Sequence, residues 1–267
     1  MVDYNIKKIF DWKDLKNELI KLRHHFHKNP ELGFKESQTS DTIFEYLNDL
    51  GLKIDKEVGG TGLIATLSKN STSKTLGIRV DMDALPIEEK NRINYKSKNK
   101  GVMHACGHDS HITIGLGIAK VLALNKEKLN GNIKFIFQPA EEKLSGAAKM
   151  ISDGIFENHQ IDSIIGFHNW PELPLGEIGL KKGAIMAAVD KFSIQINGKG
   201  GHGSEPHKTK DTVILANNFI SRIQTLISRE INPLDSAVIS IGQIRGGNAF
   251  NIIPDSIKLK GTVRSFD

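Results

Sequence analysis

Two stretches decide the predicted fold: LGIRVDMD (residues 76–83) and IKFIFQPAEE (residues 133–142). In each stretch, apolar residues alternate along a strand, and acidic residues follow where the strand ends. A third short apolar strand runs from Ser163 to Phe167, and His168 follows it. Because helical segments separate these strands, the order indicates an α/β fold with a mainly parallel sheet and helices on both faces. The carboxyl ends of such strands meet at one edge, where ligands bind.

Apolar residues at helical spacing predict four helices in the first part of the chain. These cover Asp14 to Asn29, Ser37 to Leu50, His111 to Asn125 and Ala147 to Ser152. After about Gly183 the pattern changes to strand, helix, strand, strand, which is the start of a ferredoxin-like unit. The predicted strands are 192–196, 237–244 and 256–263, and the predicted helix is 210–229. We therefore predict two domains, residues 1–183 and 184–267, and we expect the second to be incomplete.

The composition excludes several classes of protein. With 39% hydrophobic and 25% charged residues, the chain is neither disordered nor collagen-like. The absence of a long apolar run or a signal peptide, together with a single cysteine, Cys106, indicates a cytoplasmic protein that does not enter a membrane. The net charge of +5 comes from scattered lysines, so nucleic-acid binding is not expected. No phosphate-binding P-loop and no G-x-S-x-G motif occurs.

Four residues near the predicted strand ends form a candidate metal site: Cys106, His108, Glu142 and His168. Thiolate, imidazole and carboxylate together suit Zn or a similar transition metal. Glu141, beside a ligating acid, is the natural general base for a water that a metal activates. Taken singly, a lone cysteine is more often a buried apolar residue and an acidic pair is more often solvated. The joint occurrence favours the metal site.

Other polar residues are expected to lie at the surface or to cap a helix. Four histidines are predicted to lie at the surface: His24, His25, His27 and His159. Asp109 is expected to cap the helix that begins near His111.

A series of ordered motifs runs from about Leu22 to the last residue. They are RHHFHKNPELGF (23–34), RVDMDALPI (79–87), GVMHACGHDSH (101–111), FIFQPAEE (135–142), GFHNWPELPLG (166–176), GKGGHGSEPH (198–207), NAFNIIPD (248–255) and GTVRSF (261–266). With these motifs the chain resembles the amidohydrolase branch of the metallopeptidases. That branch includes hippurate hydrolase, the indole-acetyl-amino-acid hydrolases and N-acetyl-diaminopimelate deacetylase.

The resemblance implies a metal-binding α/β domain and a smaller inserted satellite domain through which the protein forms a homodimer. It implies two divalent metal ions, Zn or Mn, with Co and Ni as alternatives. Cys106 would bridge the metals, and the other ligands would be His108, Glu142 and His168. Glu141 would be the general base. Asp83 would orient a ligand histidine or balance charge, and Asp81 is a weaker candidate for the same role.

The resemblance also implies substrate-binding residues in the second domain. His202 would stabilise the tetrahedral intermediate, and Asn251 and Arg264 would bind the carboxylate or carbonyl of the substrate. The expected activity is hydrolysis of the amide bond of N-acyl amino acids or related small amides.

Two alternatives stay open. The chain could be a truncated, inactive homologue that binds metal or a partner, or a carboxypeptidase that cleaves dipeptides. Family members are expected to continue past the satellite domain and to supply one more ligand histidine. The 267-residue chain alone is therefore expected to be nearly silent in catalysis.

Overall fold

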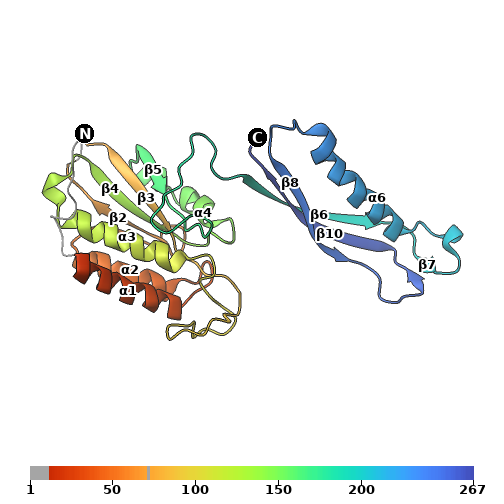
Figure 1. Ribbon diagram of the computed structural model, residues 1–267, viewed down its shortest axis with the longest axis horizontal. Helices are drawn as coiled ribbons and strands as arrows, with labels where there is room; N and C mark the ends of the chain where they lie inside the picture. The colour runs from red at the N-terminus through yellow and green to blue at the C-terminus, as the bar shows by residue number, and fades with distance from the viewer. Residues whose placement is uncertain (1–11, 71–72) are drawn as a thin grey trace. The chain divides into compact units, whose positions relative to one another are not determined.

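A computed structural model describes residues 12–70 and 73–267 (Figure 1). The chain folds into two compact units, one that ends at Glu172 and one that begins at Leu173. This boundary lies earlier in the chain than the predicted one after residue 183. Within the described ranges, every helix is too short or too polar to span a bilayer.

A five-stranded sheet with the order β1-β2-β4-β3-β5 forms the centre of the first unit. Its strands are β1 Lys53–Lys56, β2 Leu63–Leu67, β3 Thr75–Asp81, β4 Asn132–Gln138 and β5 Ser163–Gly166. β3 pairs in parallel with β4 and with β5, whereas β2 is antiparallel to both β4 and β1. Four of the five strands therefore point in one direction, as a mainly parallel sheet requires. The sequence analysis did not anticipate β1 and β2.

Helices cover both faces of this sheet, which confirms the predicted α/β class. They are α1 Trp12–Lys28, α2 Ser37–Asp49, α3 His108–Ala123, α4 Gly146–Ser152 and α5 Ile155–Asn158. Because side chains alternate along a strand, Phe135 and Phe137 of β4 pack with the α1, α2 and α3 layer. Ile136 lies on the opposite face with Met150 of α4 and Ile155 of α5.

The second unit contains three long strands and a helix, in the predicted chain order of strand, helix, strand, strand. These elements are β6 Ala188–Asn197, α6 Thr212–Thr225, β8 Ala237–Arg245 and β10 Ser256–Ser265. The sheet has the order β6-β10-β8 and is fully antiparallel. α6 packs Ala216 against Ile257 and Leu259 of β10, and Asp211 caps it by accepting two backbone N–H groups. That this unit mediates dimerisation stays a prediction.

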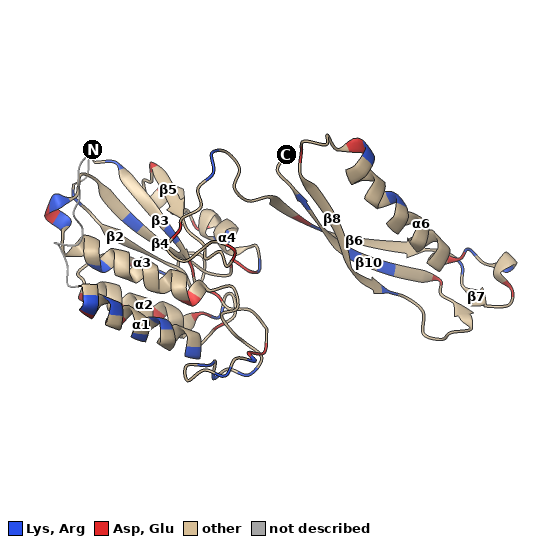
Figure 2. Ribbon diagram, in the orientation of Figure 1, with Lys and Arg blue, Asp and Glu red and all other residues tan. Residues whose placement is uncertain are grey.

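Charged residues are distributed over both units. Figure 2 shows Lys and Arg on helices, strands and loops, with Asp and Glu among them. The loose cluster of Lys96, Lys98 and Lys100 is exposed, on the loop between β3 and α3. Their exposure to solvent is typical of surface lysines.

Candidate metal centre

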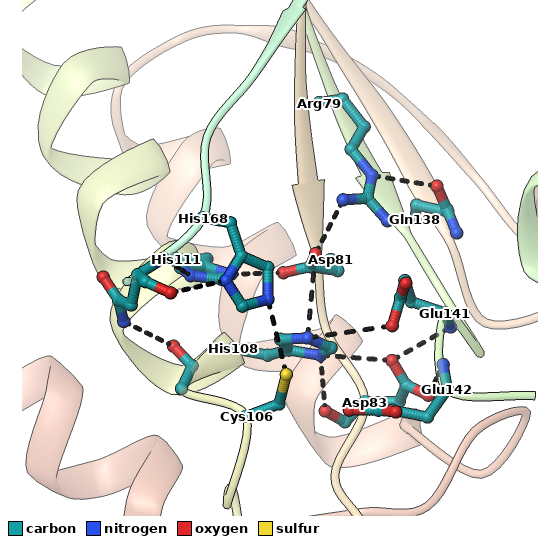
Figure 3. Close-up of polar contacts among 12 residues, drawn as sticks. Arg79, Asp81, Asp83, Cys106, His108, His111, Gln138, Glu141, Glu142 and His168 are labelled. Carbon is teal, nitrogen blue, oxygen red and sulfur yellow. Dashed lines mark hydrogen bonds and ion pairs between the residues drawn. The ribbon is translucent and has the colours of Figure 1, made fainter. Parts of the chain in front are cut away.

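The functional side chains gather at the carboxyl end of the parallel strands. In the register of the sheet, Asp81 at the end of β3 pairs with Gln138 at the end of β4, and Arg79 pairs with Gly166 at the end of β5. The segments that follow these strands therefore start side by side, which is why acidic and imidazole groups far apart in sequence meet (Figure 3).

The first turn of α3 contributes further groups. The helix begins at His108, earlier than the predicted start near His111, and its N-cap is Gly107 with a φ of 88°. A Cβ at Gly107 would lie 2.7 Å from the Asn169 side chain, so both the backbone conformation and the space require glycine. The expected capping role of Asp109 is wrong. The N-cap is Gly107 and no side chain caps the helix, while the fully buried Asp109 forms ion pairs with Arg23 and His27 of α1.

Three overlapping groups of metal-binding side chains share His108. The first contains Cys106 and His168, the second Glu141 and Glu142, and the third Asp81 and His111; within each group the candidate ligand atoms lie within 4.8 Å of one another. The first group is close, since Sγ of Cys106 is 3.3 Å from Nε2 of His168. The other three predicted ligands thus lie around His108.

Hydrogen bonds fix how the two histidines present their ring nitrogens. Nδ1–H of His108 donates to the backbone carbonyl of Asp83 at 2.9 Å, and Nδ1–H of His168 donates to the carbonyl of Asn169 at 2.7 Å. Because a carbonyl can only accept, Nε2 of each ring carries the free lone pair. In both cases Nε2 is the atom that faces the cluster. This is the tautomer that a metal-ligating histidine needs.

Two buried atoms at the centre have no hydrogen-bond partner among the described residues: Nε2 of His108 and Oε1 of Glu142. Buried polar atoms are normally paired, so an unpaired nitrogen and an unpaired carboxylate oxygen in one cluster indicate a missing partner. Both atoms are electron-pair donors. A divalent cation satisfies both, and the surrounding thiol, imidazoles and carboxylates form a donor set that suits Zn or a neighbouring transition metal.

Asp83 connects three parts of the site. Its Oδ1 and Oδ2 accept the backbone N–H groups of Glu141 and Glu142, each at 3.0 Å. Its backbone carbonyl holds His108, and its side chain is fully buried. These contacts are the ones that an orienting residue would make.

Sequence reasoning missed a second buried network beside the cluster. The backbone N–H of Asn169 donates to Nε2 of His111 at 2.9 Å, so Nδ1–H of His111 donates to Oδ1 of Asp81 at 2.6 Å. Arg79 donates to Oδ2 of Asp81 at 2.7 Å and to Gln138 at 2.9 Å. Since both nitrogens of His111 are used, this ring positions Asp81 and the segment that carries His168.

The electrostatics of the cluster favour a positive occupant. Burial would lower the pKa of His108, but the neighbouring side chains of Asp83 and Cys106 and the charge of Asp81 raise it to about 11. Burial, and then the charge of Glu142, raises the pKa of Glu141. In this anionic pocket a bound metal cation would compete with protons for these groups.

Two histidines that were predicted to lie at the surface are buried instead. His27 is only 4% exposed, and its ring lies between Asp109, at 2.7 Å from Nδ1, and Glu89, at 3.1 Å from Nε2. His159 is 8% exposed, and its Nδ1 is 2.9 Å from Nζ of Lys134. The polar face of α1 is covered by the loop that carries Glu89, which the pattern within the helix could not indicate. His25 is exposed and His24 is partly exposed.

The three predicted substrate residues lie in the second unit. His202 on β7 (Gly201–His202) pairs with Ile252 of β9 (Ile252–Ile253), and the neighbouring Gly203 donates its N–H to the carbonyl of Asn251 at 2.8 Å. His202 and Asn251 therefore lie together, and both are exposed. Arg264 is also exposed but lies near the other end of β10, eight residues beyond Ser256, roughly 26 Å along the strand.

Curated proteins that resemble this chain are named as hydrolases and deacetylases. A hippurate hydrolase from Campylobacter jejuni is 46% identical over 95% of this chain and 66% of its own length. An N-acetyl-L-cysteine deacetylase from Bacillus subtilis is 45% identical over 95% of this chain and 60% of its own length. An N-acyl-L-amino acid amidohydrolase from Geobacillus stearothermophilus is 40% identical over the whole chain and 71% of its own length. The chain thus spans about two thirds of the length of these curated relatives.

Two solved structures match the fold closely. A putative aminohydrolase from Staphylococcus aureus has a TM-score of 0.87 and 36% identity, over 95% of this chain and 68% of that one. A Bacillus subtilis protein described as a dinuclear metal-binding peptidase of the M20 family has a TM-score of 0.79 and 37% identity, over 96% of this chain and 65% of that one. The model of peptidase family M20/M25/M40 matches residues 77–261. The chain belongs to this family.

Proposed function

We propose that the protein is a metal-dependent hydrolase that cleaves the amide bond of N-acyl amino acids. One observation carries this proposal. The unpaired Nε2 of His108 and the unpaired Oε1 of Glu142 are buried in one cluster with Cys106 and His168. Such an arrangement leaves a position for a cation at the edge of the sheet where α/β enzymes bind their ligands.

The proposed ligands on this chain are Cys106, His108, Glu142 and His168. They would hold two divalent ions, Zn or Mn, with Co and Ni as alternatives. Ions in this position would polarise the amide carbonyl and lower the pKa of a nearby water molecule. Asp83 would keep His108 and the two glutamates in place through its three contacts.

Glu141 is the proposed general base. Its side chain is one third exposed, and its Oε2 lies 3.9 Å from Nε2 of His108, at the border between the cluster and solvent. The carboxylate would take a proton from water as the water oxygen bonds to the acyl carbon. It would then give the proton to the nitrogen as the C–N bond breaks, which yields a carboxylate and an amine.

The substrate class rests on the relatives. Hippurate and N-acetyl-L-cysteine, the compounds in two of these names, are both N-acyl amino acids, and they differ in the acyl group and in the amino acid. His202, Asn251 and Arg264 are proposed to contact the substrate, with the guanidinium of Arg264 binding its carboxylate. Because Arg264 lies near the far end of β10 from His202 and Asn251, one substrate molecule would meet both groups only where two subunits contribute. We further propose a cytoplasmic homodimer that forms through the second unit.

The test is hydrolysis by the full-length protein, purified and loaded with Mn²⁺ or Zn²⁺. The substrate panel contains hippurate, N-acetyl-cysteine and, for the carboxypeptidase alternative, unblocked dipeptides. E141Q should lose nearly all hydrolysis and keep its metal, because the amide cannot accept a proton. E157Q, the same change on exposed α5, is the control. Preference for dipeptides would contradict the proposed substrate class, and an active E141Q would refute the general base.

A further inference from the structure

The turn that carries Glu141 and Glu142 has an unusual backbone. It follows β4 directly, and Ala140 adopts a φ of 48°, in the left-handed region that residues with a Cβ rarely occupy. A conformation of this kind persists only where the surrounding structure determines it. What holds Ala140 in place therefore decides where the two glutamate side chains point.

Two buried carboxylates hold three consecutive N–H groups of this turn. Asp83 accepts those of Glu141 and Glu142, and Oε1 of Glu36 accepts that of Ala140 at 2.8 Å. The other oxygen of Glu36, Oε2, accepts the hydroxyl of Thr61 at 2.6 Å. Glu36 is fully buried, so both of its oxygens are paired inside the protein.

The side chain of Glu36 does not cap the helix that begins next to it. Glu36 is the N-cap residue of α2, yet its side chain makes no capping hydrogen bond. Glu31 does that instead, accepting the N–H groups of Gln38 at 3.3 Å and Thr39 at 2.8 Å. An acidic side chain at a helix N-terminus usually binds the helix. Here a second glutamate satisfies the helix, and Glu36 is available to the turn.

The packing around the turn leaves little space for another conformation. A Cβ at Gly146 would lie 1.6 Å from the carbonyl oxygen of Pro139, and one at Gly62 would lie 2.7 Å from the Pro139 ring. A Cβ at Gly33 would lie 2.9 Å from Cα of Ala140. Three glycines from three separate segments thus allow the backbone to pack closely around the turn. Glu36 accepts the N–H of Ala140 inside this close packing.

We propose that Glu36 is a positioning residue of the metal centre: its carboxylate fixes Ala140 and thereby directs Glu142 toward the cation and Glu141 toward the water. This inference rests on the function proposed above. Asp83 alone would hold the N–H groups of Glu141 and Glu142. The N–H of Ala140, the residue in the left-handed conformation, would then have no acceptor without Glu36. Glu36 acts through the backbone and touches neither substrate nor metal.

The experiment compares the affinity for Mn²⁺, by calorimetric titration of the metal-free protein, with the rate of hippurate hydrolysis. E36A should bind Mn²⁺ about 10-fold or more weakly, the loss expected when a group that supports a ligand is removed. E36Q should restore most of the affinity, because its amide oxygen still accepts from Ala140 and its NH₂ group can donate to the hydroxyl of Thr61. E31A is the matched control: it removes a half-buried glutamate whose contacts lie in the same segment, and it should leave Mn²⁺ affinity unchanged.

The outcomes distinguish a positioning role of Glu36 from a role in fold stability, and they test this role apart from the proposed function. Unchanged Mn²⁺ affinity in E36A, or an equal loss in E31A, would overturn the proposal. If E36A does not fold, E36D decides, since it keeps the charge but is one methylene too short to reach Ala140, and it should lose affinity where E36Q does not. A full-length wild-type protein that binds Mn²⁺ without hydrolysing any substrate contradicts the proposed function, while the affinities still test Glu36.

Discussion

Replacing Asp83 with asparagine should test whether both carboxylate oxygens of this residue are needed as hydrogen-bond acceptors. Asp83 must supply two acceptors, for the N–H groups of Glu141 and Glu142, and asparagine has one acceptor oxygen. The variant loses one charge-assisted hydrogen bond and turns an NH₂ group toward a backbone N–H. From about 1.5–3 kcal/mol for the bond and about 1–3 kcal/mol for the unpaired donor, we expect a loss of about 3–5 kcal/mol of unfolding free energy.

Denaturant unfolding of the metal-free protein measures this loss, and D162N is the control. Asp162 accepts a single N–H, that of Thr75 at 2.7 Å, so the one oxygen of asparagine suffices there. D162N should therefore change stability far less than D83N. If the two variants lose the same free energy, the two-acceptor reasoning is refuted. A titration with Mn²⁺ should also show weaker binding to D83N, by roughly 10- to 100-fold.

Two further predictions concern the cluster and the buried histidine. C106S should lower metal content measured by elemental analysis, because a serine oxygen replaces thiolate poorly; unchanged stoichiometry would remove Cys106 from the ligand set. For His27, the hydrogen bond to Asp109, aided by that to Glu89, raises the pKa above 6.5. A raised pKa stabilises the fold fully below pH 6.5 and progressively less as the pH rises through the folded-state value. The stability difference between wild type and H27Q should shrink over that range, and a pH-independent difference would contradict this assignment.

The sequence predicted the elements that show a clear period. The helix expected at 14–29 is observed at Trp12–Lys28, and the strand read from Ile133, Phe135 and Phe137 is observed as β4. β2 was missed because LIATL (residues 63–67) is buried on both faces and so shows no alternation. Short apolar runs of this kind give no periodic signal.

The candidate ligands could be predicted because each follows a strand or begins a helix in a recognisable motif. The supporting residues could not. Glu36 lies 104 positions from the residue that it holds, and His27 lies 82 positions from Asp109. Nothing within either local segment indicates its partner. Roles that depend on such distant contacts become visible only when the fold brings the segments together.

The parallel pairing at the centre of the sheet has a consequence for the order of folding. The donors come from segments after β3, β4 and β5, so the loops that separate these strands must close before any cation meets more than one local group. Metal ions would therefore bind late, to a sheet that is already paired. The ions would bind only the folded protein, so they would stabilise it by an amount that grows with the free metal concentration. They would not start the folding reaction.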